Sequence, residues 1–116
     1  MQALDVMRRG GVLHLAMTDG QQPYVIPLFF QLEMQGMQPI LHMVVPTRGR
    51  AAETLLHTSL ACAEIDLPAC AWVDTVLVEG SVGPGEASTK EALDLCLRAQ
   101  TVTARRYFLP SQTLAF

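Results

Sequence analysis

The sequence has little charge, and it lacks both a basic tract and a long apolar run. Only 16% of its 116 residues are charged and the net charge is −3, so nothing favours electrostatic binding to a nucleic-acid backbone. No apolar run approaches the ~20 residues of a membrane-spanning helix. The first residues also lack the apolar core of a secretory signal peptide. We therefore expect neither nucleic acid nor membrane among its partners.

Cysteine is also scarce, and the motifs of several common sites are missing. Cys62, Cys70 and Cys96 are odd in number and form no CxxC pair. This argues against a disulfide framework or a zinc site, and for the reducing cytoplasm. The sequence has no Walker loop, no GxGxxG stretch and no nucleophile elbow. His14 and His57 have no second ligand that the sequence places beside them, so no metal site is predicted.

Apolar residues, by contrast, are abundant for so short a chain. They make up 50% of the sequence. The length is enough for one domain only, so we predict a single domain over residues 1–116. A small domain has a large surface for its volume. Part of its apolar surface is therefore expected to be covered by a partner subunit or a ligand.

The first half of the chain predicts consecutive strands followed by a helix. Apolar residues alternate or cluster over 12–18, 23–32 and 39–46. Asp19-Gly20 is a strong hairpin signal between the first two of these segments. Pro27 cannot donate to a strand ladder, so we expect an edge, a bulge or an opening of the sheet there. A helix over about 48–58 follows, with Thr47 as its N-cap.

The second half predicts two more strands and a second helix. The strands cover residues 60–67 and 73–83. Ser88 and Glu91 have the spacing of a capping box, so a helix is predicted from Ser88 to about Tyr107. Residues 1–9 are expected to form a short helical turn. The order β-β-β-α-β-β-α predicts a mainly β protein, either a small antiparallel barrel or a strongly curved sheet.

Thr47-Arg48-Gly49-Arg50 is the best candidate for an anion site in the sequence. Two guanidiniums, a hydroxyl and the N–H groups of a helix start suit a phosphate monoester. A glycine between the arginines lets the backbone approach the ligand. The alternative is an ordinary loop with solvated arginines, and short motifs of this kind are hypotheses only.

Three further residues invite a chemical interpretation. His42 lies between apolar neighbours in the third predicted strand, where it can hydrogen-bond a ligand, act as acid or base, or ligate haem iron. A buried histidine paired with the backbone is the favoured alternative. Glu64 and Asp66 share one face of a predicted strand, where a solvated surface is favoured over paired-carboxylate catalysis.

The order of these motifs resembles the pyridoxamine 5′-phosphate oxidase-related split barrels, and the nitroimidazole-resistance-type subgroup in particular. The matching pieces follow one another from about Val12 to Tyr107. They are Asp19-Gly20, Tyr24-Val25-Ile26-Pro27-Leu28, Leu41-His42, Gly49-Arg50, Ala61-Cys62-Ala63-Glu64 and the strand Asp74–Gly80. The resemblance implies an antiparallel split β-barrel of the FMN-binding type with two to three flanking helices.

The same resemblance implies a homodimer that holds FMN at the subunit interface and acts on a small redox substrate. The flavin ring would lie near Ile26, Pro27, Leu28 and His42. The phosphate would meet Thr47, Arg48, Gly49 and Arg50. An FMN-dependent, nitroreductase-like oxidoreductase is the implied activity, and no residue is assigned as catalytic.

The chain also departs from the family pattern. The lysine of the family's Gly-Arg-Lys motif is Ala51 here, which removes one phosphate cation. Two alternatives therefore stay open beside an FMN enzyme. One is a haem- or deazaflavin-binding module without turnover, and the other is a dimeric family member that binds no cofactor.

Overall fold

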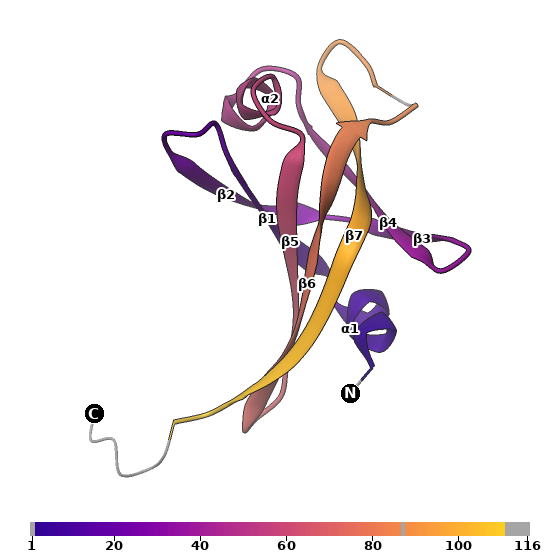
Figure 1. The fold of residues 1–116 in the computed structure, drawn as a ribbon, viewed down its shortest axis with the longest axis vertical. Coiled ribbons are helices and arrows are strands. Elements are labelled where there is room, and N and C mark those ends of the chain that lie inside the picture. The colour runs from indigo at the N-terminus through magenta and orange to yellow at the C-terminus, as the bar shows by residue number, and fades with distance from the viewer. Residues whose placement is uncertain (1, 87, 111–116) are drawn as a thin grey trace.

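Seven antiparallel strands form one sheet in the computed structural model, which describes residues 2–86 and 88–110 (Figure 1). The order across the sheet is β2-β1-β5-β6-β7-β4-β3. The strands are β1 Val12–Thr18, β2 Pro23–Phe29, β3 Gln31–Gln35, β4 Gln38–Pro46, β5 Leu60–Pro68, β6 Trp72–Pro84 and β7 Ala92–Phe108. Two helices, α1 Ala3–Arg9 and α2 Arg50–Leu55, flank the sheet. The predicted mainly β, antiparallel split barrel is confirmed.

The core lies on one face of the curved sheet, where alternate residues of each strand point inward. The burial pattern of β1 alternates along the whole strand, as the sequence predicts. Val6 and Met7 of α1 are buried with this face. The inward residues of the strands are Leu13, Leu15, Met17, Leu41, Met43, Val45, Ala63, Ile65, Val76, Val78, Leu95 and Leu97.

The second predicted strand is wrong as a single element, because the chain changes sheet edge within it. β2 ends at Phe29 on one edge of the sheet, and β3 begins at Gln31 on the other edge. Pro27 pairs with His14 on the edge strand β2, so the predicted edge position is confirmed. Phe30, between the two strands, belongs to neither of them, and we call this interruption the split of the barrel.

The predicted C-terminal helix is also wrong, since this segment forms the long strand β7 (Figure 1). β7 lies between β6 and β4, pairs with both, and so joins the two halves of the sheet. Leu93, Leu95 and Leu97 alternate with polar residues and face inward. β4 and β6 both need a hydrogen-bonding partner, and β7 supplies it to each of them. This pairing outweighs the local preference of the segment for a helix.

The apparent capping box of that helix stabilises a turn instead. The Ser88 hydroxyl accepts a hydrogen bond from the backbone N–H of Asp94 at 3.0 Å. The Thr89 hydroxyl accepts from the N–H groups of Glu91 and Ala92 at 3.3 and 3.1 Å. Short hydroxyl side chains make such bonds in turns as readily as at helix starts.

The predicted hairpin at Asp19-Gly20 is confirmed, and side-chain hydrogen bonds hold it. Asp19 Oδ1 accepts from the N–H groups of Gln21 and Gln22 at 2.8 and 2.9 Å, and these donors lower the pKa of the Asp19 carboxyl. Gly20 has φ +98°, which side chains disfavour. In Figure 1 the tip of this hairpin lies beside α2. Neither described helix is long and apolar enough to cross a membrane.

Candidate functional site

The split of the barrel forms a hollow of about 540 Å³ on the outer surface. Residues 27–31, where β2 passes into β3, line one side of it. His42, Met43 and Val44 of β4 and Asp94 of β7 line the other. Four of the five residues on the first side are apolar, so the walls suit a flat aromatic ligand. We call this hollow the groove.

His42 projects from β4 into the groove and already has a partner on each ring nitrogen. Nε2 lies 3.3 Å from Oε1 of Glu33 on β3, and Nδ1 lies 3.3 Å from Sγ of Cys96 on β7. The side chain is 33% exposed. The favoured expectation of a buried histidine paired with the backbone is therefore wrong, because two side chains from neighbouring strands hold the ring. The sequence alone could not show these partners, since register between distant strands sets them.

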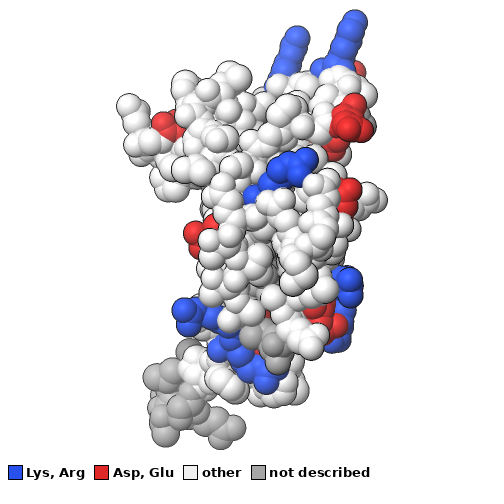
Figure 2. Space-filling view, turned by 45° about the vertical axis from the view of Figure 1, so that its right-hand side comes forward, with Lys and Arg blue, Asp and Glu red and all other residues white. Residues whose placement is uncertain are grey.

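A second hollow, of about 450 Å³, lies at the end of β4 and carries positive charge. Thr47 and Arg48 line it from one side, and Lys90 and Glu91 from the loop before β7 line it from the other. The Thr47 hydroxyl donates to the Lys90 carbonyl at 2.6 Å, which holds the two segments together. We call this the cation hollow. Figure 2 shows Lys and Arg side chains extending from this end of the molecule.

Lys90 is a candidate that sequence reasoning missed. It lies 43 positions beyond Thr47, inside the segment predicted as a helix, so no spacing motif connects the two. The strand β7 brings its loop next to the end of β4 through the pairing of Pro46 with Ala92. Lys90 thereby places a second cation in the hollow that Arg48 lines.

Arg50 points elsewhere, toward the β1–β2 hairpin. Its Nη2 donates to Oε1 of Gln22 at 3.2 Å and to the carbonyl of Pro23 at 3.3 Å. Its guanidinium lies 4.9 Å from the ring centroid of Tyr24, in a cation–π contact. These contacts tie α2 to the hairpin. The structure therefore does not gather the two arginines of the predicted motif around one point.

The helix after this motif is shorter than predicted, running from Arg50 to Leu55. Its N-cap is Gly49 with φ +146°, not Thr47, and no side chain caps it. That backbone angle lies outside the helical region, so the helix cannot begin earlier. Six residues supply only a small dipole, and the cationic side chains must provide most of any anion affinity.

Other predicted residues divide between the groove and the core. Pro27 and Leu28 line the groove with His42. Ile26 does not line it, and like Leu28 it packs against the core as a partly buried residue. Neither Gly49 nor Arg50 is among the residues that line the groove or the cation hollow. The predicted site residues thus separate into an apolar part and a cationic part.

A third cluster lies on the outer face of β1 and β5. Ligand atoms of His14, Glu64 and Asp66 all lie within 4.8 Å of one another. His14 pairs with Glu64 across the two strands, a partner that the sequence did not reveal. Burial raises the pKa of the Glu64 carboxyl, and the neighbouring Asp66 raises it further. Asp66 also accepts a hydrogen bond from Thr75 at 2.8 Å.

Comparison with known proteins identifies the fold. No family model and no curated protein matches the chain, but solved structures do. An FAD-binding protein from Mesorhizobium loti has a TM-score of 0.72 and 16% identity, over 91% of this chain and 93% of that one. A candidate pyridoxamine 5′-phosphate oxidase from Listeria innocua has a TM-score of 0.71 and 11% identity, over 87% and 93%.

Two further structures have the same fold. A candidate 5-nitroimidazole antibiotic resistance protein from Bacteroides thetaiotaomicron has a TM-score of 0.69 and 13% identity, over 90% of this chain and 82% of that one. A haem-binding protein from Mycobacterium smegmatis has 0.70 and 16%, over 91% and 56%. The predicted resemblance to the pyridoxamine 5′-phosphate oxidase-related split barrels is confirmed at the level of the fold.

Proposed function

We propose that this protein binds FMN across the groove and the cation hollow, and uses it as a cytoplasmic oxidoreductase. The observation that carries the proposal is the alignment of the two hollows along β4. His42 and Val44 line the groove, and Pro46, on the same face of the strand, lines the cation hollow. Four residues of strand span about 13 Å. A ligand with a flat ring and an anionic tail fits this layout.

The residues present fit such a ligand. The ring would lie against Pro27, Leu28 and Phe30, whose apolar side chains exclude water from one of its faces. Arg48 and Lys90 would hold the phosphate, because two cations match its charge and can donate to its oxygens. Thr47, whose hydroxyl donates to the Lys90 carbonyl, would hold the loop of Lys90 in place beside them. When bound, the flavin would supply hydride and electron transfer, while the protein supplies binding and electrostatics.

The solved structures with the same fold support a flavin as the ligand. The two side-chain partners of His42 argue against the haem alternative. One neighbour is an FAD-binding protein and one binds haem. Ligation of iron by His42 would need a free ring nitrogen, and both nitrogens already have side-chain partners. A haem would therefore have to displace Glu33 or Cys96. A flavin needs only the groove wall.

A homodimer is part of the proposal. Phe29 at the rim of the groove is 82% exposed, and Val25 and Val44 on the outer surface are 58% and 57% exposed. Apolar groups in such positions favour a protein partner. A second copy related by two-fold symmetry would cover this surface and close the groove over the ring. The three free cysteines fit a reducing compartment.

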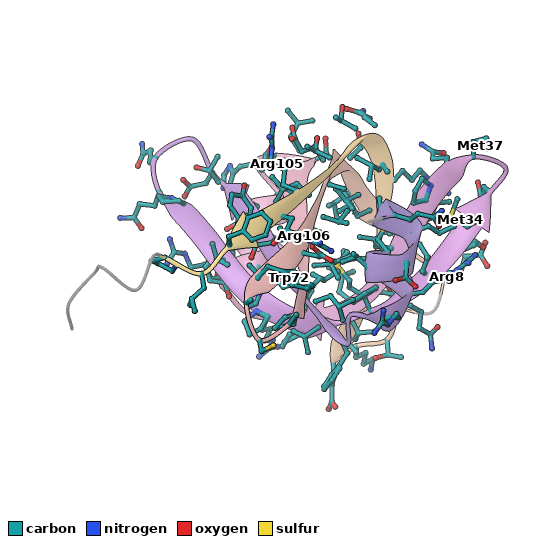
Figure 3. The ribbon with its side chains drawn as sticks, turned by 90° about the horizontal axis from the view of Figure 1, so that it is seen from below. Arg8, Met34, Met37, Trp72, Arg105 and Arg106 are labelled. Atoms are coloured by element: carbon teal, nitrogen blue, oxygen red, sulfur yellow. The ribbon has the colours of Figure 1, made fainter. Side chains whose placement is uncertain are left out.

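Reconstitution with FMN tests the proposal. Purified protein is mixed with excess FMN and desalted, and the flavin absorption that remains is measured against protein concentration. We expect about one flavin per chain. The double variant Arg48→Gln/Lys90→Gln should lose most of it, while Arg8→Gln, an exposed arginine on α1 (Figure 3), should not.

Two results would count against the proposal. Absence of flavin on the wild-type protein would overturn flavin binding, and a haem titration followed at the Soret band would then test the alternative. Equal retention by the double variant and the wild type would overturn the phosphate assignment alone. If flavin is retained, reduction of the loaded protein by nicotinamide donors and reoxidation by nitroaromatic compounds test the redox activity.

A further inference from the structure

Cys96, His42 and Glu33 form a hydrogen-bonded chain across three strands beside the groove. His42 and Cys96 are cross-strand partners in the β4–β7 pairing. Gln31 pairs with His42 in the β3–β4 pairing, which places Glu33, two residues further along, on the same face of β3. The two links are both 3.3 Å long, from Sγ to Nδ1 and from Nε2 to Oε1.

The carboxylate decides which nitrogen of the imidazole carries the proton. An ionised Glu33 can only accept, so Nε2 of a neutral His42 must donate to it. Nδ1 then carries no proton, and its lone pair faces the Cys96 sulfur. The arrangement places a base within reach of a thiol and orients that base with a third group, which is the geometry of an activated nucleophile.

The surroundings of Cys96 disfavour the thiolate form of its side chain. Burial raises the pKa of the Cys96 thiol, and the carboxylates of Asp94, Glu33 and Glu86 add to this effect. Arg98, two residues along β7, acts in the opposite direction. The thiol therefore needs a base to react near neutral pH, and the adjacent imidazole is that base. Cys62 and Cys70 have no histidine within hydrogen-bonding distance among the described contacts.

We propose that Cys96, which is partly exposed, is a base-assisted nucleophile that adds to small α,β-unsaturated carbonyl compounds with His42 as its base. Sγ forms a bond to the β-carbon, and the thiol proton moves to Nδ1. The electron pair of the carbon–carbon double bond shifts to give an enolate. The imidazolium then returns the proton to the α-carbon, so that addition consumes no further reactant. This activity requires no flavin and goes beyond the proposed function.

Competition among the three cysteines of the chain tests this proposal. The full chain, without added flavin, is treated with limiting N-ethylmaleimide, and peptide mass spectrometry gives the rate of addition at each cysteine. Cys70 is exposed and Cys62 is half-buried, so they are internal controls. We expect Cys96 to react faster than Cys62 and to follow a different dependence on pH, because its proton acceptor is an imidazole.

Two variants separate base assistance from packing. His42→Asn should slow Cys96 by about tenfold or more, in line with the lower end of general-base effects, and should leave the Cys70 rate unchanged. Glu33→Gln should also slow it, because an amide can donate to Nε2 and place the ring proton on Nδ1. The effect should be smaller than that of His42→Asn, because the amide oxygen can still accept from Nε2. The pH profile of Cys96 should change as well.

Each of these experiments has a result that would overturn the proposal. If Cys96 reacts no faster than Cys62 at any pH, or at the same rate in His42→Asn as in the wild type, the proposal is overturned. If His42→Asn does not fold, as circular dichroism would show, Glu33→Gln decides. An unchanged rate and an unchanged pH profile in Glu33→Gln would then overturn it.

Discussion

Arg106 holds Asp74 through two hydrogen bonds at once, between paired positions of β7 and β6. Nε donates to Oδ1 at 2.6 Å and Nη2 donates to Oδ2 at 3.0 Å. The guanidinium also lies 4.4 Å from the ring centroid of Trp72. Both residues are labelled in Figure 3. The guanidinium binds the carboxylate with two parallel hydrogen bonds and stacks on the aromatic ring. Together these contacts fix the far end of β7 to the sheet.

Loss of this pair should destabilise the protein in a way that depends on pH. We expect Arg106→Gln to lower the melting temperature by a few degrees at neutral pH. Arg105→Gln is the matched control, because Arg105 is exposed and lies on the opposite face of β7. Its melting temperature should stay close to that of the wild type.

The direction of the pH dependence follows from Asp74. The Arg106 guanidinium holds the pKa of the Asp74 carboxyl below its ordinary value of 3.8. Because the folded pKa is lowered, the stabilisation is complete above the unfolded pKa and is lost as the pH falls through the folded one. Thermal melts between about pH 2 and 7 should show the gap between wild type and Arg106→Gln closing in acid. A constant gap would contradict this account.

Replacement of Gly80 by alanine should destabilise the protein, whereas the same replacement at Gly83, in the same strand, should be tolerated. A Cβ at Gly80 would collide with the backbone carbonyl of Arg98, at the β-bulge where the register of β6 and β7 shifts. We expect Gly80→Ala to cost about 1–3 kcal/mol of unfolding free energy. Gly83→Ala meets nothing within 4 Å and is the control. Urea unfolding measures both, and equal effects would refute the steric explanation.

Leu97 tests the strand assignment of the C-terminal segment. Its side chain is fully buried in the core, while Met37 at the β3–β4 turn is 95% exposed (Figure 3). Truncation of a buried leucine leaves a cavity, so Leu97→Ala should cost about 2–5 kcal/mol. Met37→Ala should change stability by less than about 0.5 kcal/mol. Denaturant melts of both variants check this, and a mild effect at Leu97 would argue against β7 as a core strand.

Phe29 should govern self-association if the proposed dimer forms over the groove. Replacement by serine removes a large exposed apolar group from the proposed interface, so Phe29→Ser should raise the dimer dissociation constant by tenfold or more. That change corresponds to about 1.4 kcal/mol. Sedimentation velocity over a concentration series measures it. Met37→Ser, on the opposite edge of the sheet, should associate like the wild type, and a monomeric wild type would reject the dimer.

Arg50 should matter less for flavin retention than the cation hollow does. Its guanidinium is held by Gln22, Pro23 and Tyr24, so we expect Arg50→Ala to loosen α2 from the hairpin and to keep most of the FMN. The desalting assay on Arg50→Ala, beside Arg48→Gln/Lys90→Gln, makes the comparison. If Arg50→Ala loses all its flavin while circular dichroism is unchanged, the arginine binds the phosphate directly.

Local signals in the sequence determined much of the sheet. Imperfect alternation over Val12–Thr18 predicted β1 with its bounds, and Asp19-Gly20 predicted the turn because few residues accept that backbone geometry. Pro27 predicted an edge, a bulge or an opening of the sheet, since it cannot donate to a ladder. For each of these elements the information lies within a few residues of the feature. The split-barrel fold was predicted through a resemblance to a known family, which rests on the order of the motifs along the chain.

Only the tertiary structure decided which distant residues meet. Ala92–Phe108 has signals for both helix and strand, and β4 and β6 settle the choice because each needs a hydrogen-bonding partner. That strand brings Lys90 to Thr47 and Cys96 to His42. A shift of the register by one residue would turn the Cys96 side chain to the other face of the sheet. The composition of the candidate site is therefore a property of strand pairing, which a sequence pattern does not specify.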